Sequence, residues 1–218
     1  MSSLDYSAPR TRVAAASREA FVEQEFHAGR DLQSRNVEAT PVTAAEVVEF
    51  WRQAGPSMWF AKDADFDRRF REAFLSAHEA AARGELDSWL ATPTGALALV
   101  LLLDQFPRNA FRGTPRMYAS DAMARNIAAA AIAAGRDQLV PADLRTFFYL
   151  PFAHSEDLAD QDRAVALCRP LGDPDSSNSE RHRDIVRRFG RFPHRNAILG
   201  REMTPEEQEF LDQGGYAG

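Results

Sequence analysis

Hydrophobic residues recur every three or four positions along most of the chain, which is the spacing of one face of an α-helix. Between residues 65 and 83 this face is formed by Phe66, Phe70, Phe74 and Ala77. We find no segment with the strict alternation of hydrophobic and polar residues that marks a half-buried strand. The pattern therefore predicts an all-α fold.

Capping signals divide this helical pattern into elements. Thr43 followed by Glu46 is a capping box, in which each side chain bonds the backbone N–H of the other, and it predicts a helix that ends at Gly55 and Pro56. Threonine followed by proline marks three further starts, at Thr92–Pro93, Thr114–Pro115 and Thr204–Pro205. We expect eight or nine helices, packed as an antiparallel array.

Local signals also assign the less regular segments. Ser155 is predicted to cap a helix that runs to about Arg169, where Pro170 ends it. Residues 172–179 are small and polar, so we expect a loop there. Residues 1–40 are predicted to be a partly disordered N-terminal extension with one helix, and residues 41–218 to be a single helical domain.

One motif occurs twice, because residues 106–113 read FPRNAFRG and residues 192–200 read FPHRNAILG. Each copy follows an amphipathic helix, so we expect proline to stop the helix, asparagine to adopt a turn or left-handed conformation, and arginine to remain at the helix end. Two interpretations stay open, since turn chemistry explains the proline and asparagine but not the arginine. The motif is a capping turn, or Arg108 and Arg195 bind a ligand.

Composition narrows the classes of function. The 218 residues are 44% hydrophobic and 27% charged, which is enough for a packed core. A net charge of -6 argues against nucleic acid as a partner, and the longest apolar run, residues 95–103, is far shorter than the roughly 20 residues that span a membrane. The single cysteine, Cys168, lies in an apolar pattern that predicts a core thiol. We expect a soluble, cytoplasmic protein.

The hydrophobic face that Leu97 and Leu101 share also includes Asp104. A carboxylate on that face would be buried, and a buried carboxylate needs an ionic or hydrogen-bonding partner. We predict an ion pair with an arginine of one of the two repeated motifs. This pair would serve only to join helices, or Asp104 would take part in catalysis.

His154 lies beside aromatic residues and directly before Ser155, Glu156 and Asp157. A neighbouring carboxylate could orient this histidine as a general base. The alternative is a structural histidine with satisfied hydrogen bonds, since a helix N-terminus, which favours negative charge, already explains Glu156 and Asp157. The candidate catalytic residues are His154 and Asp104.

Residues 181–195 hold six arginines and one acidic residue, in a chain that is acidic overall. Guanidinium groups bind carboxylate and phosphate through two parallel N–H donors. Arg183 and Arg187 fit a solvent-exposed helix face, whereas the arginines at the turn suggest a binding site for an anion. The candidate ligand-binding residues are Arg108, Asn109, Arg191, His194, Arg195 and Asn196.

Signals for a metal or a cofactor are weak. His154, His182 and His194 could converge with Glu156 or Asp157, but the sequence contains no His-Glu-x-x-His motif and no two histidines four residues apart. It also lacks the glycine-rich nucleotide-binding loops and the Gly-x-Ser-x-Gly motif. The sequence therefore predicts no metal site and indicates no particular cofactor.

These motifs resemble a family of bacterial proteins, domain of unknown function 924. The resemblance covers the chain from about Val42 onward, and long segments carry it: LLDQFPRN at 102–109, LPFAHSED at 150–157 and RFGRFPHRN at 188–196. It implies an all-helical fold similar to that of tetratricopeptide-repeat proteins. No established activity comes with the resemblance.

Two functions are compatible with these residues. In the first, an enzyme or binding protein, one pocket for a small anionic molecule is lined by six residues: Asp104, Arg108, His154, Arg191, His194 and Arg195. In the second, a tetratricopeptide-like array binds an acidic peptide along an open groove. The unusual polar residues gather at helix ends beside prolines and aromatic residues, which favours the pocket.

Overall fold

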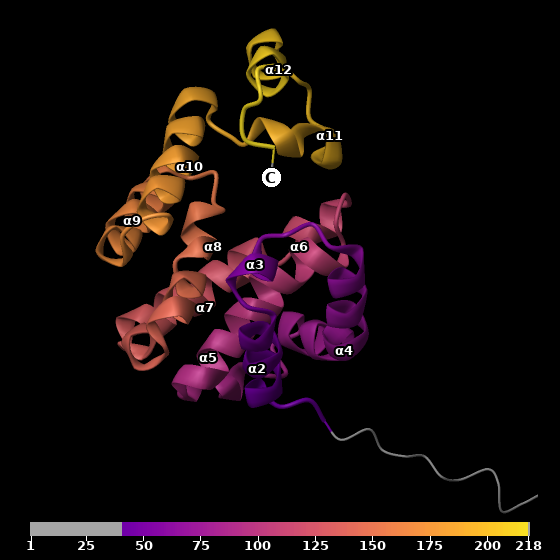
Figure 1. The fold of residues 1–218 in the computed structure, drawn as a ribbon, viewed down its shortest axis with the longest axis vertical. Coiled ribbons are helices and arrows are strands. Elements are labelled where there is room, and N and C mark those ends of the chain that lie inside the picture. The colour runs from indigo at the N-terminus through magenta and orange to yellow at the C-terminus, as the bar shows by residue number, and fades with distance from the viewer. Residues whose placement is uncertain (1–40, 218) are drawn as a thin grey trace, which may run out of the picture. The chain divides into compact units, whose positions relative to one another are not determined.

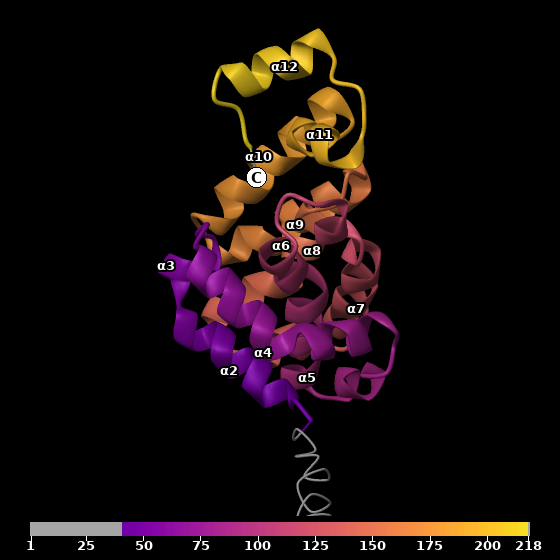
Figure 2. The same ribbon diagram turned by 90° about the vertical axis from the view of Figure 1, so that its right-hand side faces the viewer.

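A computed structural model describes residues 41–217, and each regular element in that range is helical (Figures 1 and 2). This confirms the predicted all-α class. The α-helices are α2 (Ala44–Ala54), α3 (Pro56–Trp59), α4 (Ala64–Ala82), α5 (Pro93–Val100), α6 (Phe106–Ala110), α7 (Asp121–Ala133), α8 (Leu150–Ala153), α9 (Leu158–Cys168), α10 (Asp175–Phe189), α11 (Asn196–Leu199) and α12 (Pro205–Asp212). They outnumber the eight or nine expected because several are single turns with a proline at the first or second position, among them α3, α6 and α8.

Shorter segments link these helices. One is a π-helix, η2 (Leu101–Gln105), and the others are the 3-10 helices η1 (Asp87–Ala91), η3 (Pro115–Tyr118), η4 (Arg136–Leu139), η5 (Ala142–Phe148), η6 (Arg169–Leu171) and η7 (Pro193–Arg195). The tetratricopeptide-like array stays a prediction, and the predictions for residues 1–40 lie outside the described range. Within that range, we find no helix with the length and apolar character to cross a membrane.

The capping box predicted at Thr43 is present, and the helix start predicted at Thr204–Pro205 has one as well. At the start of α2, the Thr43 N–H donates to Glu46 Oε2 at 2.7 Å and the Glu46 N–H donates to Thr43 Oγ1 at 3.3 Å. Thr204 and Glu207 make the same pair of bonds at the start of α12, at 2.8 and 3.2 Å. Because these bonds satisfy N–H groups that a helix start leaves free, short sequence signals suffice to position both helices.

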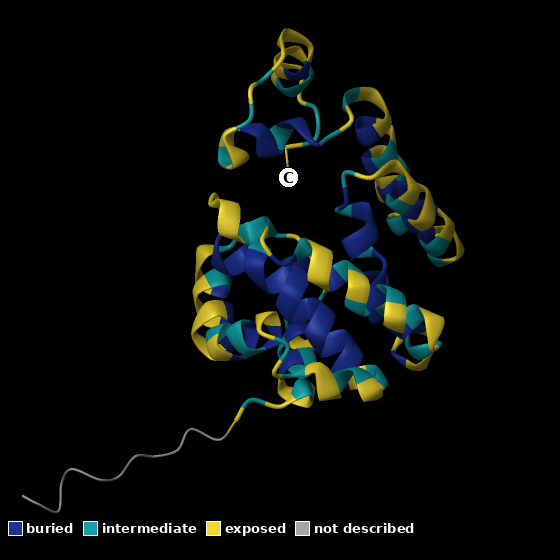
Figure 3. Ribbon diagram, turned by 180° about the vertical axis from the view of Figure 1, so that it is seen from behind, coloured by how far each residue is buried: buried dark blue, intermediate teal, exposed yellow. Residues whose placement is uncertain are grey.

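The main hydrophobic core surrounds α5 and η2. Every residue from 95 to 107 is buried, and Figure 3 shows this helix inside the others. Stacked and edge-on aromatic rings of α2, α3, α4 and η5 fill one side, including Trp51, Trp59, Phe70 and Phe147. A second, smaller core joins α10 to the C-terminal residues through Ile185, Val186 and Phe192. The site described below lies where these two cores meet.

The π-helical segment explains how a helix continues through Pro107. The Phe106 N–H donates to the Leu101 carbonyl, one residue farther back than in an α-helix, and proline has no N–H to offer the turn before it. Four side chains form hydrogen bonds of 2.6 to 2.9 Å with the backbone carbonyls of residues 102–105. The His78 side chain bonds the carbonyl of Leu102, Ser120 that of Leu103, Arg108 that of Asp104 and Asn109 that of Gln105. The segment thereby holds Asp104 in a fixed position.

Both repeated motifs differ from expectation in the same way. Pro107 and Pro193 do not stop a helix but lie in the first turn of a short one, α6 and η7. Asn109 and Asn196 are helical, so neither takes the left-handed conformation. That conformation falls on the glycines that close each motif, Gly113 and Gly200, because glycine has no Cβ to clash there.

Two further boundaries correct the sequence analysis. The N-cap of α9 is Asp157, whose Oδ1 accepts from the N–H groups of Ala159 and Asp160. Ser155, predicted as that cap, instead accepts from the Asp157 N–H and donates to Asp160. The loop expected over residues 172–179 ends early, since α10 begins at Asp175. Polar composition misled that boundary, because the first turn of a helix tolerates serine and aspartate.

Candidate functional site

A cavity of about 390 Å³ lies between the two hydrophobic cores. Its walls come from α3, α6, η3, α8, α10, η7 and Tyr216 near the C-terminus. The volume falls within the range of about 300 to 1,000 Å³ that small-molecule sites occupy. Cys168 lines it as part of the main core, as expected, and burial raises the pKa of its thiol to about 12, so the thiol stays protonated at neutral pH.

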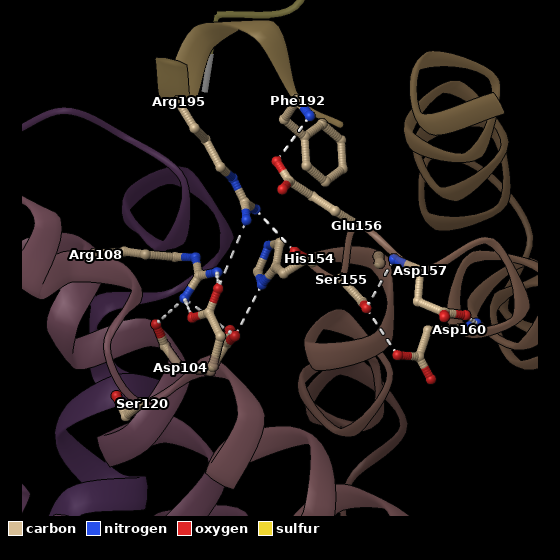
Figure 4. A network of polar contacts seen from close by, with 12 residues as sticks. Asp104, Arg108, Ser120, His154, Ser155, Glu156, Asp157, Asp160, Phe192 and Arg195 are labelled. Atoms are coloured by element: carbon tan, nitrogen blue, oxygen red, sulfur yellow. Dashed lines mark hydrogen bonds and ion pairs between the residues drawn. The ribbon is translucent and has the colours of Figure 1, made fainter. Parts of the chain in front are cut away.

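The predicted ion pair of Asp104 is present, and its partner is Arg108 of the first repeated motif (Figure 4). The Asp104 side chain is fully buried, and Arg108 Nη1 lies 3.2 Å from its Oδ1. Arg108 also donates to both carboxylate oxygens of Asp121, at 2.9 and 3.0 Å. Burial opposes ionisation of Asp104, but Arg108 and then His154 outweigh it and hold the pKa of Asp104 at about 2.

His154 bonds the same carboxylate from the cavity side. Its Nδ1 lies 2.9 Å from Asp104 Oδ1, and Figure 4 shows the ring between Asp104 and Arg195. Burial, and then repulsion from Arg108, lowers the pKa of His154, so the ring is neutral at pH 7. The ionised Asp104 places the single ring proton on Nδ1. Nε2 is then a proton acceptor, and no residue within 41–217 bonds it.

Arg195, the matching arginine of the second repeated motif, reaches the same cluster. Its guanidinium carbon lies 4.6 Å from the Tyr118 ring centre and 4.5 Å from that of Phe192. Nη2 donates to the His154 carbonyl at 2.9 Å, and Nη1 is 3.8 Å from Asp121. Its Nε is buried without a hydrogen bond among the described residues. Burial, and then repulsion from Arg108, lowers the pKa of Arg195.

Three histidines and one tyrosine form the wall beside Arg195. The Tyr216 ring lies 4.7 Å from His182 and 5.2 Å from His194, and the His182 and His154 rings are 6.4 Å apart. Burial is the main cause that lowers the pKa of His182 to about 3 and of His194 to about 4. No three histidine, cysteine or acidic side chains within the described range are placed to hold a metal. Neutral histidines instead offer hydrogen bonds and can take up protons.

The structure brings most of the predicted site residues together. Arg108, Asn109, His154, His194 and Arg195 line the cavity, with Asp104 directly behind His154. Arg191 and Asn196 do not line it.

Both of these residues hold Glu207, the buried capping residue of α12. Arg191 Nε donates to Glu207 Oε1 at 2.6 Å, and Asn196 Nδ2 donates to Oε2 at 3.2 Å. A buried carboxylate needs such partners, so these two side chains serve the C-terminal fold.

Several residues of the site were not found from sequence. Asp121 joins Arg108 to Arg195, and Tyr118, Tyr216 and Phe60 line the cavity. They come from separate elements, and no local spacing signals their approach. Glu156, explained earlier as a helix-end charge, lies before α9 and reaches across to the second repeated motif.

Glu156 holds the C-terminal segment to the main core. It accepts from the Phe192 N–H at 2.8 Å and from two nitrogens of Arg201 at 2.7 and 3.0 Å. Replacing Glu156 by glutamine should lower the free energy of unfolding by about 1.5 to 3 kcal/mol, because hydrogen bonds to a charged group are lost. Urea denaturation measures this. The exposed Glu206→Gln is the matched control and should change it by less than about 0.5 kcal/mol.

Comparison with known proteins assigns the family. The model of a family described as "bacterial protein of unknown function (DUF924)" matches residues 47–215. A solved structure, a protein of unknown function (ATU0120) from Agrobacterium tumefaciens, is 60% identical with a TM-score of 0.77, over 78% of this chain and 97% of that one. Among curated proteins, none is similar enough to match. Since the match spans both repeated motifs, Asp104 and His154, the chain belongs to the DUF924 family of bacterial proteins, as its motifs predicted.

Proposed function

We propose that this protein binds a small organic anion, a carboxylate or a phosphate, in the cavity beside Arg195 and His154. The observation that supports this most is the state of Arg195, which is only 7% exposed and yet has an unbonded Nε. Guanidinium offers five N–H donors, and burying them without acceptors is costly. A ligand that accepts hydrogen bonds would satisfy the unbonded donor and so offset this unfavourable free energy.

The charges around the cavity support an anion as well. Lys62 and Arg181 line it, and neither makes an ion pair with another described residue. Among the described residues, Asp175 is the one acidic side chain in the lining, against the two positive charges of Lys62 and Arg181. The site is therefore locally positive in a chain of net charge -6, which favours the approach of negative ligands.

Asp104 and His154 would move a proton within this site. Asp104 fixes the His154 ring, and Nε2 would accept a proton from an acidic ligand or from a substrate. An anion beside the three histidines would also favour their protonated forms. The proposal thus includes the catalytic role predicted for these two residues, with His154 as the base and Asp104 as the group that positions it.

A titration with acetate, citrate, inorganic phosphate and glycerol phosphate tests the proposal by thermal shift. A ligand at 100 times its dissociation constant stabilises the fold by about 2.7 kcal/mol. Arg181→Ala should weaken that stabilisation, because Arg181 lines the cavity, and Arg195→Gln should remove it.

Arg187→Ala is the matched control for Arg181→Ala. Arg187 is on the same helix but pairs with Asp184 away from the cavity, so its loss should leave the stabilisation unchanged. Equal effects of the two substitutions would contradict the proposal. Binding of an acidic peptide without any small anion would favour the alternative, a tetratricopeptide-like interaction module.

A further inference from the structure

The cavity lining includes apolar residues besides its polar ones, among them Trp59, Phe60, Met117, Leu150 and Ala153. Phe60 is 64% exposed, although one face of its ring lies on Phe147 with the ring centres 6.2 Å apart. An exposed phenyl ring costs free energy in water, and at a cavity it marks a surface that a ligand would cover.

Helix α8 connects an apolar lining residue, Leu150, to the polar His154 that follows the helix. Phe147, whose ring stacks with that of Phe60, lies three residues before Leu150, and His154 follows Ala153 directly. Leu150 and His154 both line the cavity, and four residues of helix advance by about 6 Å. An anion held near His154 therefore has apolar surface within the length of a short carbon chain.

We infer that the ligand is an amphipathic organic acid, with its carboxylate or phosphate at Arg195 and His154 and an aliphatic or aromatic body against Phe60 and Leu150. This inference rests on the proposed function and adds the chemistry of the rest of the ligand. An inorganic anion would satisfy the polar wall but would fill only a small part of about 390 Å³ and leave Phe60 in water.

A series of straight-chain acids tests this inference. Acetate, butanoate, hexanoate and octanoate are titrated at constant ionic strength, and histidine ring signals in NMR report binding even when it is weak. Each methylene group buried should tighten binding about fourfold, which corresponds to about 0.8 kcal/mol. Phe60→Ala should weaken octanoate about tenfold and leave acetate within about twofold.

Two controls separate the possible results. Leu139→Ala removes another exposed side chain, 71% exposed and outside the cavity lining, and should leave the whole series unchanged. Equal affinity for all four acids would overturn this inference and leave anion binding standing. Hexanamide binding as tightly as hexanoate would overturn the proposed function, because the anion would then add nothing. The absence of binding by every acid and by inorganic phosphate and glycerol phosphate would overturn it too.

Discussion

Replacing Arg108 by leucine should lower the free energy of unfolding by about 3 to 5 kcal/mol. Arg108 is 15% exposed and lies between Asp104, which is fully buried, and Asp121. Its loss leaves the fully buried Asp104 and the largely buried Asp121 without their main counter-charge, and stranded buried charges have costs of this size. Urea denaturation at pH 7 measures the change.

Arg112 provides a matched control for Arg108. It also lines the cavity and also bonds one aspartate through two nitrogens, Asp67 at 2.9 and 3.0 Å, but its side chain is 34% exposed. Water would replace these bonds, so Arg112→Leu should cost less than about 1 kcal/mol. Similar losses for the two variants would contradict the idea that burial sets the importance of Arg108.

The fold was predictable where the signal is local. The capping box of Thr43 and Glu46 needs residues three apart, and the face of Phe66, Phe70 and Phe74 needs only the helical period. The burial of Asp104 followed from the same reasoning, because Leu97 and Leu101 share its face. Its pairing with a repeated-motif arginine followed because a buried carboxylate needs a partner.

The site was predictable only in part, because its contacts join distant segments. Glu156 bonds the N–H of Phe192, 36 positions away, and no spacing rule reports that. Arg191 and Arg195 lie in similar sequence surroundings, yet Arg191 forms an ion pair with Glu207 of α12, whereas Arg195 lines the cavity. The position of α12 determines which of the two arginines lines the cavity, and no local sequence pattern predicts where α12 packs.

Acid should destabilise this protein well before its carboxylates protonate. His182 and His194 have pKa values of about 3 and 4, while a histidine in the unfolded chain has a pKa of about 6.5. Below pH 6.5 the unfolded chain therefore binds protons that the folded protein does not, and stability falls as the pH falls. From pH 7 to pH 5 each histidine should cost about 2 kcal/mol, and the loss continues until the pH reaches the folded-state pKa.

Urea denaturation at pH 7, 6 and 5 measures this loss, and the double variant with His182→Gln and His194→Gln should remove most of it. Some loss should remain, because burial also lowers the pKa values of His78 and His154. The window separates histidines from carboxylates, since Asp104, with a pKa of about 2, loses its contribution at lower pH. A wild-type protein as stable at pH 5 as at pH 7 would mean that these rings protonate readily while folded. The cavity would then already hold positive histidines before any anion arrives.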